Sequence, residues 1–381
     1  MEIKEKDLIR LSKTDISKQE INSVINVLKK GYLGMGDEVN FFESELSNYL
    51  GRDVACVVNG TAALQLALQA CNIGKGDEVL IPSLTYVASY QAILATGAMP
   101  VSCDVNEDDL IISISDARNK ITNNTKAIVP VFFSGGVGDL EGLYSFAKEY
   151  KLRVIEDAAH AFGSRYNNQL IGSFGDITCF SFDGIKNISS GEGGCIVTND
   201  PSVMDKVKDS RLLGVIKDTE NRYARNRSWE FDVTEIGWRY HMSNIMASIG
   251  ITQLKRINIF TSKRQALAKL YDSLFKDNDY IQPLVRDYNN IVPHIYVVRI
   301  KGLVKKNELR DSMLKLNIQT GSHYQPNHLL SLFNKSGNCP ITEKVSKELI
   351  SLPLHTSLTK KQVKFVASSL ISLLNNKICS Y

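Results

Sequence analysis

Short apolar runs alternate with amphipathic segments along most of the chain from about residue 54. The apolar runs are rich in Val, Ile, Cys and Phe, as buried strands are, and they cover residues 53–58, 77–83, 99–105, 126–133, 152–158, 176–182 and 193–198. Segments of helical composition lie between several of these runs, at residues 61–72, 87–98 and 139–150. Strands and helices in alternation predict an α/β domain built in layers around a largely parallel sheet.

The pattern changes after residue 242. Residues 243–275 have the composition of one long helix or of two joined helices, a length that suits a bridge between two domains. Further on, residues 294–300 predict a strand, and the segments typical of helices are 305–317 and 359–376. We therefore expect a large domain of residues 1–254 and a small C-terminal α+β domain of residues 255–381.

Composition and charge narrow the class of protein. The chain has 381 residues, of which 43% are hydrophobic and 23% charged, and its net charge is only +4 with no long Lys/Arg block, so no nucleic-acid partner is expected. No stretch of about 18 apolar residues predicts a membrane span, and the charged N-terminus is unlike a signal peptide. The seven cysteines follow no regular spacing and several lie in apolar runs, which predicts reduced thiols and a cytoplasmic location.

Two polar features leave alternatives open. A mildly basic stretch is either a solvated loop or a clamp for an anionic small substrate; it contains Arg211, Lys217, Arg222, Arg225 and Arg227. The six histidines show no zinc-type pairing with the cysteines, and His323 and His328 in a loop-like segment are weak evidence for a metal site. No metal is therefore expected.

Polar and aromatic side chains follow the predicted strands, where an open α/β sheet binds its ligands. Gly60, Thr61 and Ala62 follow the first strand and open a predicted helix, and such a helix N-terminus suits a phosphate group. Thr61 is equally an ordinary helix N-cap. Tyr86 follows the next strand, where it could either pack or stack on a ligand.

An acid and a lysine follow two further strands. Glu156 and Asp157 end the run at 152–158, and a buried acid there requires a cation or a hydrogen-bond donor. Ser181 and Lys186 lie in the segment FSFDGIKNISSGEGG. A phosphate cradle, an aromatic face, a carboxylate and a lysine are what pyridoxal phosphate (PLP) requires for its phosphate, its ring, its pyridine nitrogen and its aldehyde. The glycines of GEGG would let the backbone pass close to this cofactor.

The chain resembles the DegT/StrS-type (DegT/DnrJ/EryC) nucleotide-sugar aminotransferases. The resemblance is carried by residues 31–51, 59–68, 76–89, 155–166, 172–194 and 235–254, and the combination of EDAAHA with FSF, a lysine and GEGG is specific. It implies the fold type I of PLP-dependent transferases, with PLP and its amino form PMP as cofactor. It further implies transfer of an amino group from L-glutamate to a keto group of a nucleotide-diphosphate sugar, in amino-sugar biosynthesis for a surface polysaccharide such as lipopolysaccharide O-antigen or for a glycosylated product.

The same resemblance implies a role for individual residues. Lys186 matches the Schiff-base lysine, Asp157 the partner of the pyridine nitrogen, and His160 a neighbour of the cofactor's phenolic oxygen. The remaining cofactor contacts that it implies, in the phosphate cradle and on the ring, are Gly60, Thr61, Ala62, Tyr86 and Ser181.

The resemblance also implies a homodimer with shared sites. Tyr32 lies in the loop expected near the junction of the chains, and His323 and Tyr324 match a segment that reaches the substrate. Arg239 stands where the family often has an Asn that contacts the partner's cofactor phosphate, and a guanidinium also suits phosphate. Phe132 or Phe133 replaces a frequent His, which makes that wall more apolar.

Other functions fit the sequence less well. Lys186 disfavours the related dehydratases, which have His at this place. A nicotinamide-linked oxidoreductase would need G-x-G-x-x-G after the first strand, and NGTAAL lacks it. A non-catalytic regulator of this fold would be favoured by an added DNA-binding domain, and none is visible. Amination at C-3 or C-4 and the nucleotide (dTDP, UDP or GDP) stay open, with a dTDP-4-keto-6-deoxy hexose expected by analogy alone.

Overall fold

The computed structural model describes residues 8–224 and 229–375. Its centre is a seven-stranded sheet with the strand order β1-β9-β8-β5-β4-β2-β3. The strands are β1 (Asp53–Val57), β2 (Glu78–Pro82), β3 (Met99–Cys103), β4 (Thr125–Ile128), β5 (Arg153–Asp157), β8 (Ile177–Ser181) and β9 (Gly194–Thr198). β9 runs antiparallel to both β1 and β8, whereas the other neighbours run parallel. The predicted α/β fold with a mostly parallel sheet is confirmed.

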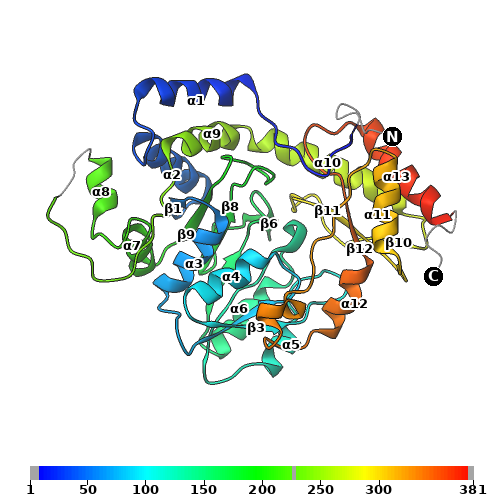
Figure 1. Cartoon of the computed structure of the whole chain (residues 1–381), viewed down its shortest axis with the longest axis horizontal. Helices are drawn as coiled ribbons and strands as arrows, with labels where there is room; N and C mark the ends of the chain where they lie inside the picture. The colour runs from blue at the N-terminus through cyan, green and yellow to red at the C-terminus, as the bar shows by residue number, and fades with distance from the viewer. Residues whose placement is uncertain (1–7, 225–228, 376–381) are drawn as a thin grey trace.

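Helices cover both faces of this sheet, as Figure 1 shows. In β1, Val54 and Cys56 pack into one core with α2 (Asp37–Leu50) and α6 (Leu140–Glu149). Ala55 and Val57 pack into a second core on the opposite face. The helices of that face are α3 (Gly60–Ala70), α4 (Val87–Ala95) and α7 (Pro201–Ser210). This follows from the period of two along a strand, because successive side chains point to opposite faces.

The C-terminal part has a sheet of its own. Its three antiparallel strands are β10 (Ile281–Pro283), β11 (Tyr296–Ile300) and β12 (Leu349–Leu352). They pack with α11 (Lys306–Lys315) and α13 (Lys360–Asn375) in a third core. The strand and the two helices expected in this part of the sequence are therefore present.

Residues 243–275 form two joined helices, α9 (Asn244–Lys255) and α10 (Ile257–Phe275). Ile257 and Phe260 of α10 belong to the core of the large sheet, whereas Leu267 and Tyr271 belong to the C-terminal core. α10 thus joins the two parts of the molecule, and Figure 1 shows it running toward α13. The division between residues 254 and 255 stays a prediction.

The hydrophobic pattern missed the helix α1 (Lys18–Lys30), although its start has a local signal. Ser17 and Glu20 form a capping box, and the helix ends at Gly31, whose φ is 74°. The other described elements that the pattern missed are α2, α5 (Ile114–Asn119), β6 (Arg165–Tyr166), β7 (Gln169–Leu170), α7, α8 (Asp218–Tyr223), β10, α12 (Pro340–Glu348) and β12. Most of these elements are only two to six residues long, which is too short to show a clear hydrophobic period.

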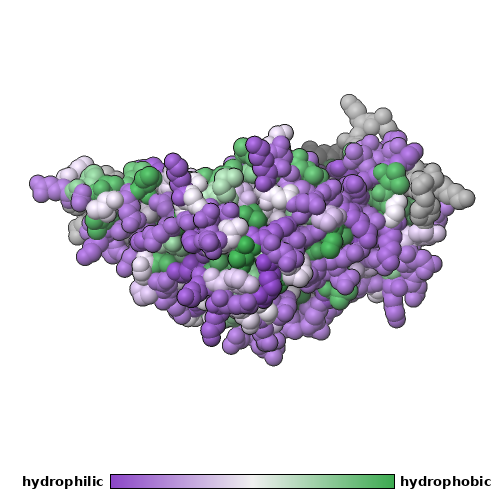
Figure 2. Space-filling view, turned by 90° about the horizontal axis from the view of Figure 1, so that it is seen from below, coloured by the Kyte–Doolittle hydropathy of each residue, from purple (hydrophilic) through white to green (hydrophobic). Residues whose placement is uncertain are grey.

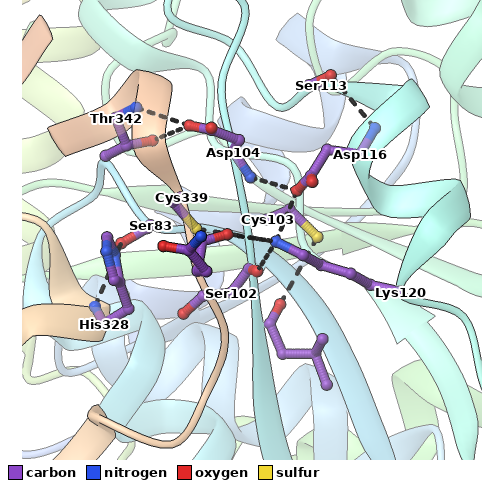
Figure 3. Close-up of polar contacts among 12 residues, drawn as sticks. Ser83, Ser102, Cys103, Asp104, Ser113, Asp116, Lys120, His328, Cys339 and Thr342 are labelled. Carbon is purple, nitrogen blue, oxygen red and sulfur yellow. Dashed lines mark hydrogen bonds and ion pairs between the residues drawn. The ribbon is translucent and has the colours of Figure 1, made fainter. Parts of the chain in front are cut away.

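Lys120 connects the C-terminal part to the β3 edge of the large sheet through hydrogen bonds (Figure 3). Its Nζ donates to Ser102 O at 2.8 Å, to Asp116 Oδ2 at 2.8 Å and to Asn338 O at 2.9 Å. Ser102 lies in β3, and Asn338 lies just before α12. One ammonium group therefore connects two distant segments.

Asp104 and Ser83 hold the same C-terminal segment at two further points (Figure 3). The Asp104 carboxylate accepts hydrogen bonds from the backbone N–H of Ile341 and of Thr342, in the first turn of α12, at 2.8 and 2.6 Å. Ser83 Oγ lies 2.6 Å from His328 Nδ1. Residues 328–342 are thus fixed against the ends of β2 and β3.

The surface is mainly polar. Figure 2 shows one face on which hydrophobic patches are small and separated by hydrophilic side chains. Within the described parts of the chain, no helix is both long and apolar enough to cross a membrane.

Candidate active site

A cavity of about 450 Å³ lies at the carboxyl ends of β1, β5 and β8. The predicted site residues that line it are Gly60, Thr61, Tyr86, Asp157, His160, Ser181, Lys186, His323 and Tyr324. Ala62, Arg239 and Tyr32 are not among its lining residues. Segments far apart in the sequence thus meet in one hollow, as the ligand-binding edge of an open α/β sheet requires.

The first turn of α3 forms one wall of the cavity. Asn59 caps this helix, because its Oδ1 accepts a hydrogen bond from Ala62 N at 2.8 Å. The alternative that Thr61 is the N-cap is therefore wrong. A Cβ atom on Gly60 would lie 2.9 Å from Ser181 Cβ, so only glycine allows the helix start to lie this close to Ser181. Helix N–H groups and two hydroxyls, of Thr61 and Ser181, meet at a place suited to a phosphate group.

The glycines of GEGG have a different environment from the one expected. Cβ atoms would come within 2.7 Å of Asn59 O on Gly194 and 2.1 Å of Ser190 Oγ on Gly193. Neither glycine lines the cavity. Gly194 thus allows β9 to lie close to Asn59 at the start of α3, and Glu192 of the same segment lines the cavity.

Asp157 ends β5 with its carboxylate buried. Its Oδ2 accepts a hydrogen bond from Ser89 Oγ at 2.6 Å, and its Oδ1 accepts one from Ala159 N at 3.2 Å. Burial raises the pKa of Asp157, although these bonds and the charge of Lys186 oppose the rise. No local motif marks Ser89, which lies in α4. The carboxylate is oriented and still faces the cavity.

Lys186 lies in the cavity wall, partly buried, in the segment between β8 and β9. Among the described residues its Nζ has no hydrogen bond or ion pair. Burial lowers the pKa of Lys186 to about 8, while the charges of Asp157 and Asp183 act in the opposite direction. A sizeable fraction of this amine is therefore neutral near physiological pH, which is what a nucleophilic lysine needs.

His160 is buried and neutral. Its Nδ1 accepts a hydrogen bond from Ser134 N at 3.4 Å, so the ring proton sits on Nε2, which lies 3.2 Å from Tyr324 Oη. Burial, followed by the charges of Lys186 and His323, lowers the pKa of His160 well below its usual value. A neutral Nε2–H donor thus points into the cavity. The ring of His294, unmarked in the sequence, lies 4.4 Å behind it.

Aromatic side chains also line the cavity, among them Tyr86 and Tyr324. Tyr86 is 60% exposed, and its ring centroid lies 5.8 Å from that of Tyr324. The ring of Phe133 meets Tyr324 edge to face at 6.2 Å. Phe132 and Phe133 are fully buried and do not line the cavity, so an apolar wall made by either one stays a prediction.

The basic stretch, which the sequence left open as a solvated loop or a clamp for an anionic substrate, divides in the described part of the chain. Arg211 is fully buried and forms an ion pair with Glu43, so it belongs to neither a solvated loop nor a substrate clamp. Arg222 pairs with Asp218 at 2.8 Å. Arg225 and Arg227 lie outside the described residues.

Two predicted contacts point away from this chain's own cavity. Arg239 is exposed and lines a second hollow, beside Lys217 and Arg222. Tyr32 is 50% exposed in the loop before α2. Neither residue lines the cavity of its own chain.

The two candidate metal ligands are engaged separately. His323 Nδ1 lies 2.7 Å from Ser351 Oγ, whereas His328 bonds to Ser83. Within residues 8–224 and 229–375, no group of three or more His, Cys, Asp and Glu side chains could hold a metal ion.

The fold and this site define a PLP-dependent transferase of fold type I. The cradle around Gly60 and Ser181, the unpaired amine of Lys186 and the buried Asp157 fit the phosphate, aldehyde and pyridine nitrogen of the cofactor. Residues 14–371 match the sequence profile of the DegT/DnrJ/EryC1/StrS aminotransferase family. The chain belongs to this family, and its cofactor is PLP.

Known proteins resemble the chain along nearly its whole length. It is 36% identical over 359 residues to the spore coat polysaccharide biosynthesis protein SpsC of Bacillus subtilis, with 91% of this chain and 92% of that protein covered. It is 36% identical over 346 residues to GDP-perosamine synthase of Escherichia coli O157:H7, with 90% and 92% covered. Spr1654 of Streptococcus pneumoniae, assigned as a sugar aminotransferase, superposes in its PMP form with a TM-score of 0.90, 30% identity, and 97% and 99% covered.

Proposed function

We propose that the enzyme transfers an amino group from L-glutamate to the keto group of a nucleotide-diphosphate-linked 4-keto-6-deoxy hexose. The observation that carries the proposal is the amine of Lys186, which has no partner among the described residues, in a cavity that also holds Asp157 and a phosphate cradle. The alternative within the same chemistry is amination at C-3. The product would be an amino sugar for a surface polysaccharide or a glycosylated product, and the naming of SpsC for spore coat polysaccharide supports this setting.

PLP, when bound, supplies an aldehyde and a conjugated ring that accepts electrons. Lys186 would bind the aldehyde carbon and, once displaced by the amino donor, would carry a proton from Cα of glutamate and later one to the sugar carbon. Asp157 would hold the proton of the ring nitrogen. The start of α3 with Ser181 would bind the phosphate, and the Nε2–H of His160 would donate to the phenolic oxygen.

The test of this proposal begins with colour. The purified enzyme with PLP should absorb in the visible range and lose that absorbance when glutamate is added. Lys186→Ala should abolish turnover and keep some cofactor binding. Turnover of this variant at the wild-type rate would contradict the assignment of Lys186.

The sugar and its nucleotide need a separate test. We place a dTDP-linked sugar first, and the similarity to GDP-perosamine synthase adds GDP-linked sugars to the screen. Keto sugars on dTDP, UDP and GDP would be incubated with glutamate, and the products identified by NMR. A product aminated at C-3 would replace the C-4 proposal, and the absence of any aminated product would refute it.

We further infer that two copies of the chain form a dimer with shared sites. Large apolar side chains are exposed on α1 and on the segment that follows α8: Ile21, Leu28, Trp229, Phe231 and Ile236. Burial of such side chains against a second copy would be favourable. Arg239 and Tyr32 would then reach the partner's cavity. Mixing Lys186→Ala with Arg239→Ala subunits should restore activity, because one of the two sites in the mixed dimer then has both residues. Sedimentation of the protein as a monomer would refute this arrangement.

A cytoplasmic location completes the proposal. The six described cysteines are free, namely Cys56, Cys71, Cys103, Cys179, Cys195 and Cys339. Reduced thiols are typical of that compartment. Fractionation of cells with an antibody to the protein would test it.

A further inference from the structure

Arg264 is a buried cation without a counter-ion. Its side chain lies in α10 with an exposed fraction of 3%, and no carboxylate pairs with it among the described residues. Burial lowers the pKa of Arg264 to about 10. A buried guanidinium costs free energy unless its N–H groups are satisfied, so the partners that it does have are informative.

Those partners are three backbone carbonyls from two segments. Arg264 Nη1 donates to Pro293 O at 3.3 Å and to His294 O at 3.0 Å, and Nη2 donates to Lys186 O at 3.4 Å. The guanidinium therefore ties the residue that bears the reactive amine to the loop before β11.

The segment around Lys186 depends on such bonds. Residues 183–189 belong to neither a helix nor a strand, so no regular ladder of hydrogen bonds fixes them. Asn187 adds a second tie to the same loop, because its Nδ2 donates to Val292 O at 3.2 Å and to Phe162 O at 3.0 Å. The loop 292–294 is thus the surface on which the lysine segment rests.

The same loop also supports His160. His294 packs its ring 4.4 Å from that of His160, and the His294 Nδ1 has no partner among the described residues. One guanidinium consequently fixes the backbone beneath two groups that face the cofactor site.

We propose that Arg264 is a positioning residue that sets the reach of Lys186 Nζ toward the cofactor aldehyde. This inference rests on the role of Lys186 in the proposed function. When the neutral amine attacks the aldehyde carbon, a C=N bond forms and the aldehyde oxygen leaves as water. That step requires the amine at bonding distance, whereas the phosphate and ring contacts do not involve Lys186.

A comparison of PLP with PMP separates the bond to Lys186 from the phosphate and ring contacts. PMP carries an amine in place of the aldehyde, so it binds without a bond to Lys186. We would measure PMP affinity by equilibrium dialysis, and the lysine–PLP bond by absorbance and by mass spectrometry after borohydride reduction. Arg264→Met should weaken the lysine–PLP bond by about 10- to 100-fold and change PMP affinity much less, because a displacement of about 1 Å costs a reaction of this kind that much. Arg264→Lys should restore part of the loss.

Arg52 provides the matched control. Its buried guanidinium donates to the carbonyls of residues 172, 174, 175 and 176, none of which lines the cavity. Arg52→Met should leave the ratio of PLP to PMP binding unchanged.

Equal losses of PLP and PMP binding in Arg264→Met, or no loss, would overturn the proposal. If Arg264→Met does not fold, Arg264→Gln takes its place, and an unchanged ratio of PLP to PMP binding in that variant counts against the role. A wild-type enzyme that forms no bond between Lys186 and PLP would instead refute the proposed function.

Discussion

Lys186 and Lys120 are both partly buried lysines beside the large sheet, but their ammonium groups meet opposite surroundings. Lys120 Nζ has three oxygen partners, from Ser102, Asp116 and Asn338. Burial alone would lower the pKa of Lys120, yet the hydrogen bond to Asp116 and the charge interactions with Cys339, Asp116 and Cys103 together outweigh burial and raise this pKa. Lys186 has no such partner among the described residues, and its pKa falls to about 8. Burial is common to both lysines, and the partners decide which amine stays charged and which is available for chemistry.

Removal of Lys186 is expected to have the largest effect. Lys186→Ala should lower kcat by about 10⁴-fold or more, the scale of losing a residue that forms a covalent bond in catalysis. Lys120→Ala, assayed as folded protein, should keep kcat near the wild-type value. Steady-state kinetics on both variants measures the contrast, and equal losses would erase the distinction between the two lysines.

Asp157→Asn should have the next largest effect. The amide cannot hold the ring-nitrogen proton as the carboxylate does, so kcat should fall by about 10²- to 10³-fold, the usual scale for a lost electrostatic partner. Ser89 can still bond to the new side chain, so the melting temperature should change little. A full rate in this variant would remove Asp157 from the site.

Lys120→Met should act on stability. Asp116 and two carbonyls lose their shared donor, which should lower the free energy of unfolding by about 1–3 kcal/mol. Urea unfolding with an unchanged m-value would measure this loss. Unchanged stability would show that water replaces the ammonium at no cost.

Lys186→Met should have the smallest effect, and it should be opposite in sign. The folded pKa of about 8 lies below the unfolded value of 10.5, so the unfolded chain binds more protons between these pH values. The charged lysine therefore costs stability below pH 8, and the cost fades as the pH rises toward 10.5. Without cofactor, Lys186→Met should be more stable by about 1–2 kcal/mol at pH 7, with a gain that shrinks above pH 8, since the side chain is only partly buried. A gain in stability that stays constant from pH 7 to pH 10 would show that the gain does not come from the lowered pKa of Lys186.

The sequence predicted what depends on local pattern. The alternating pattern predicted all seven strands of the large sheet, because each of them is a continuous apolar run. The strand ends brought Asp157, Ser181 and Lys186 into one cavity, because parallel strands share an edge. These are consequences of periodicity and topology.

Contacts between distant segments could not be predicted in this way. Arg211 looked like a free cation, but its partner Glu43 comes from α2. No local motif marks Ser89, Arg264 or His294. Their roles depend on contacts with residues distant in the sequence. β12 was missed because its four residues follow α12 directly, with no turn signal before them.

The cavity draws on segments from Asn59 to Tyr324, and this sets an order of assembly. During synthesis on the ribosome, the strands that bear Asp157 and Ser181 emerge long before α10 and Tyr324. The phosphate cradle can therefore form on the nascent chain, while the lysine segment still lacks Arg264 beneath it and the cavity lacks its aromatic wall. The final third of the chain, which holds both Arg264 and Tyr324, completes both, so capture of the cofactor at Lys186 belongs to the end of the protein's synthesis.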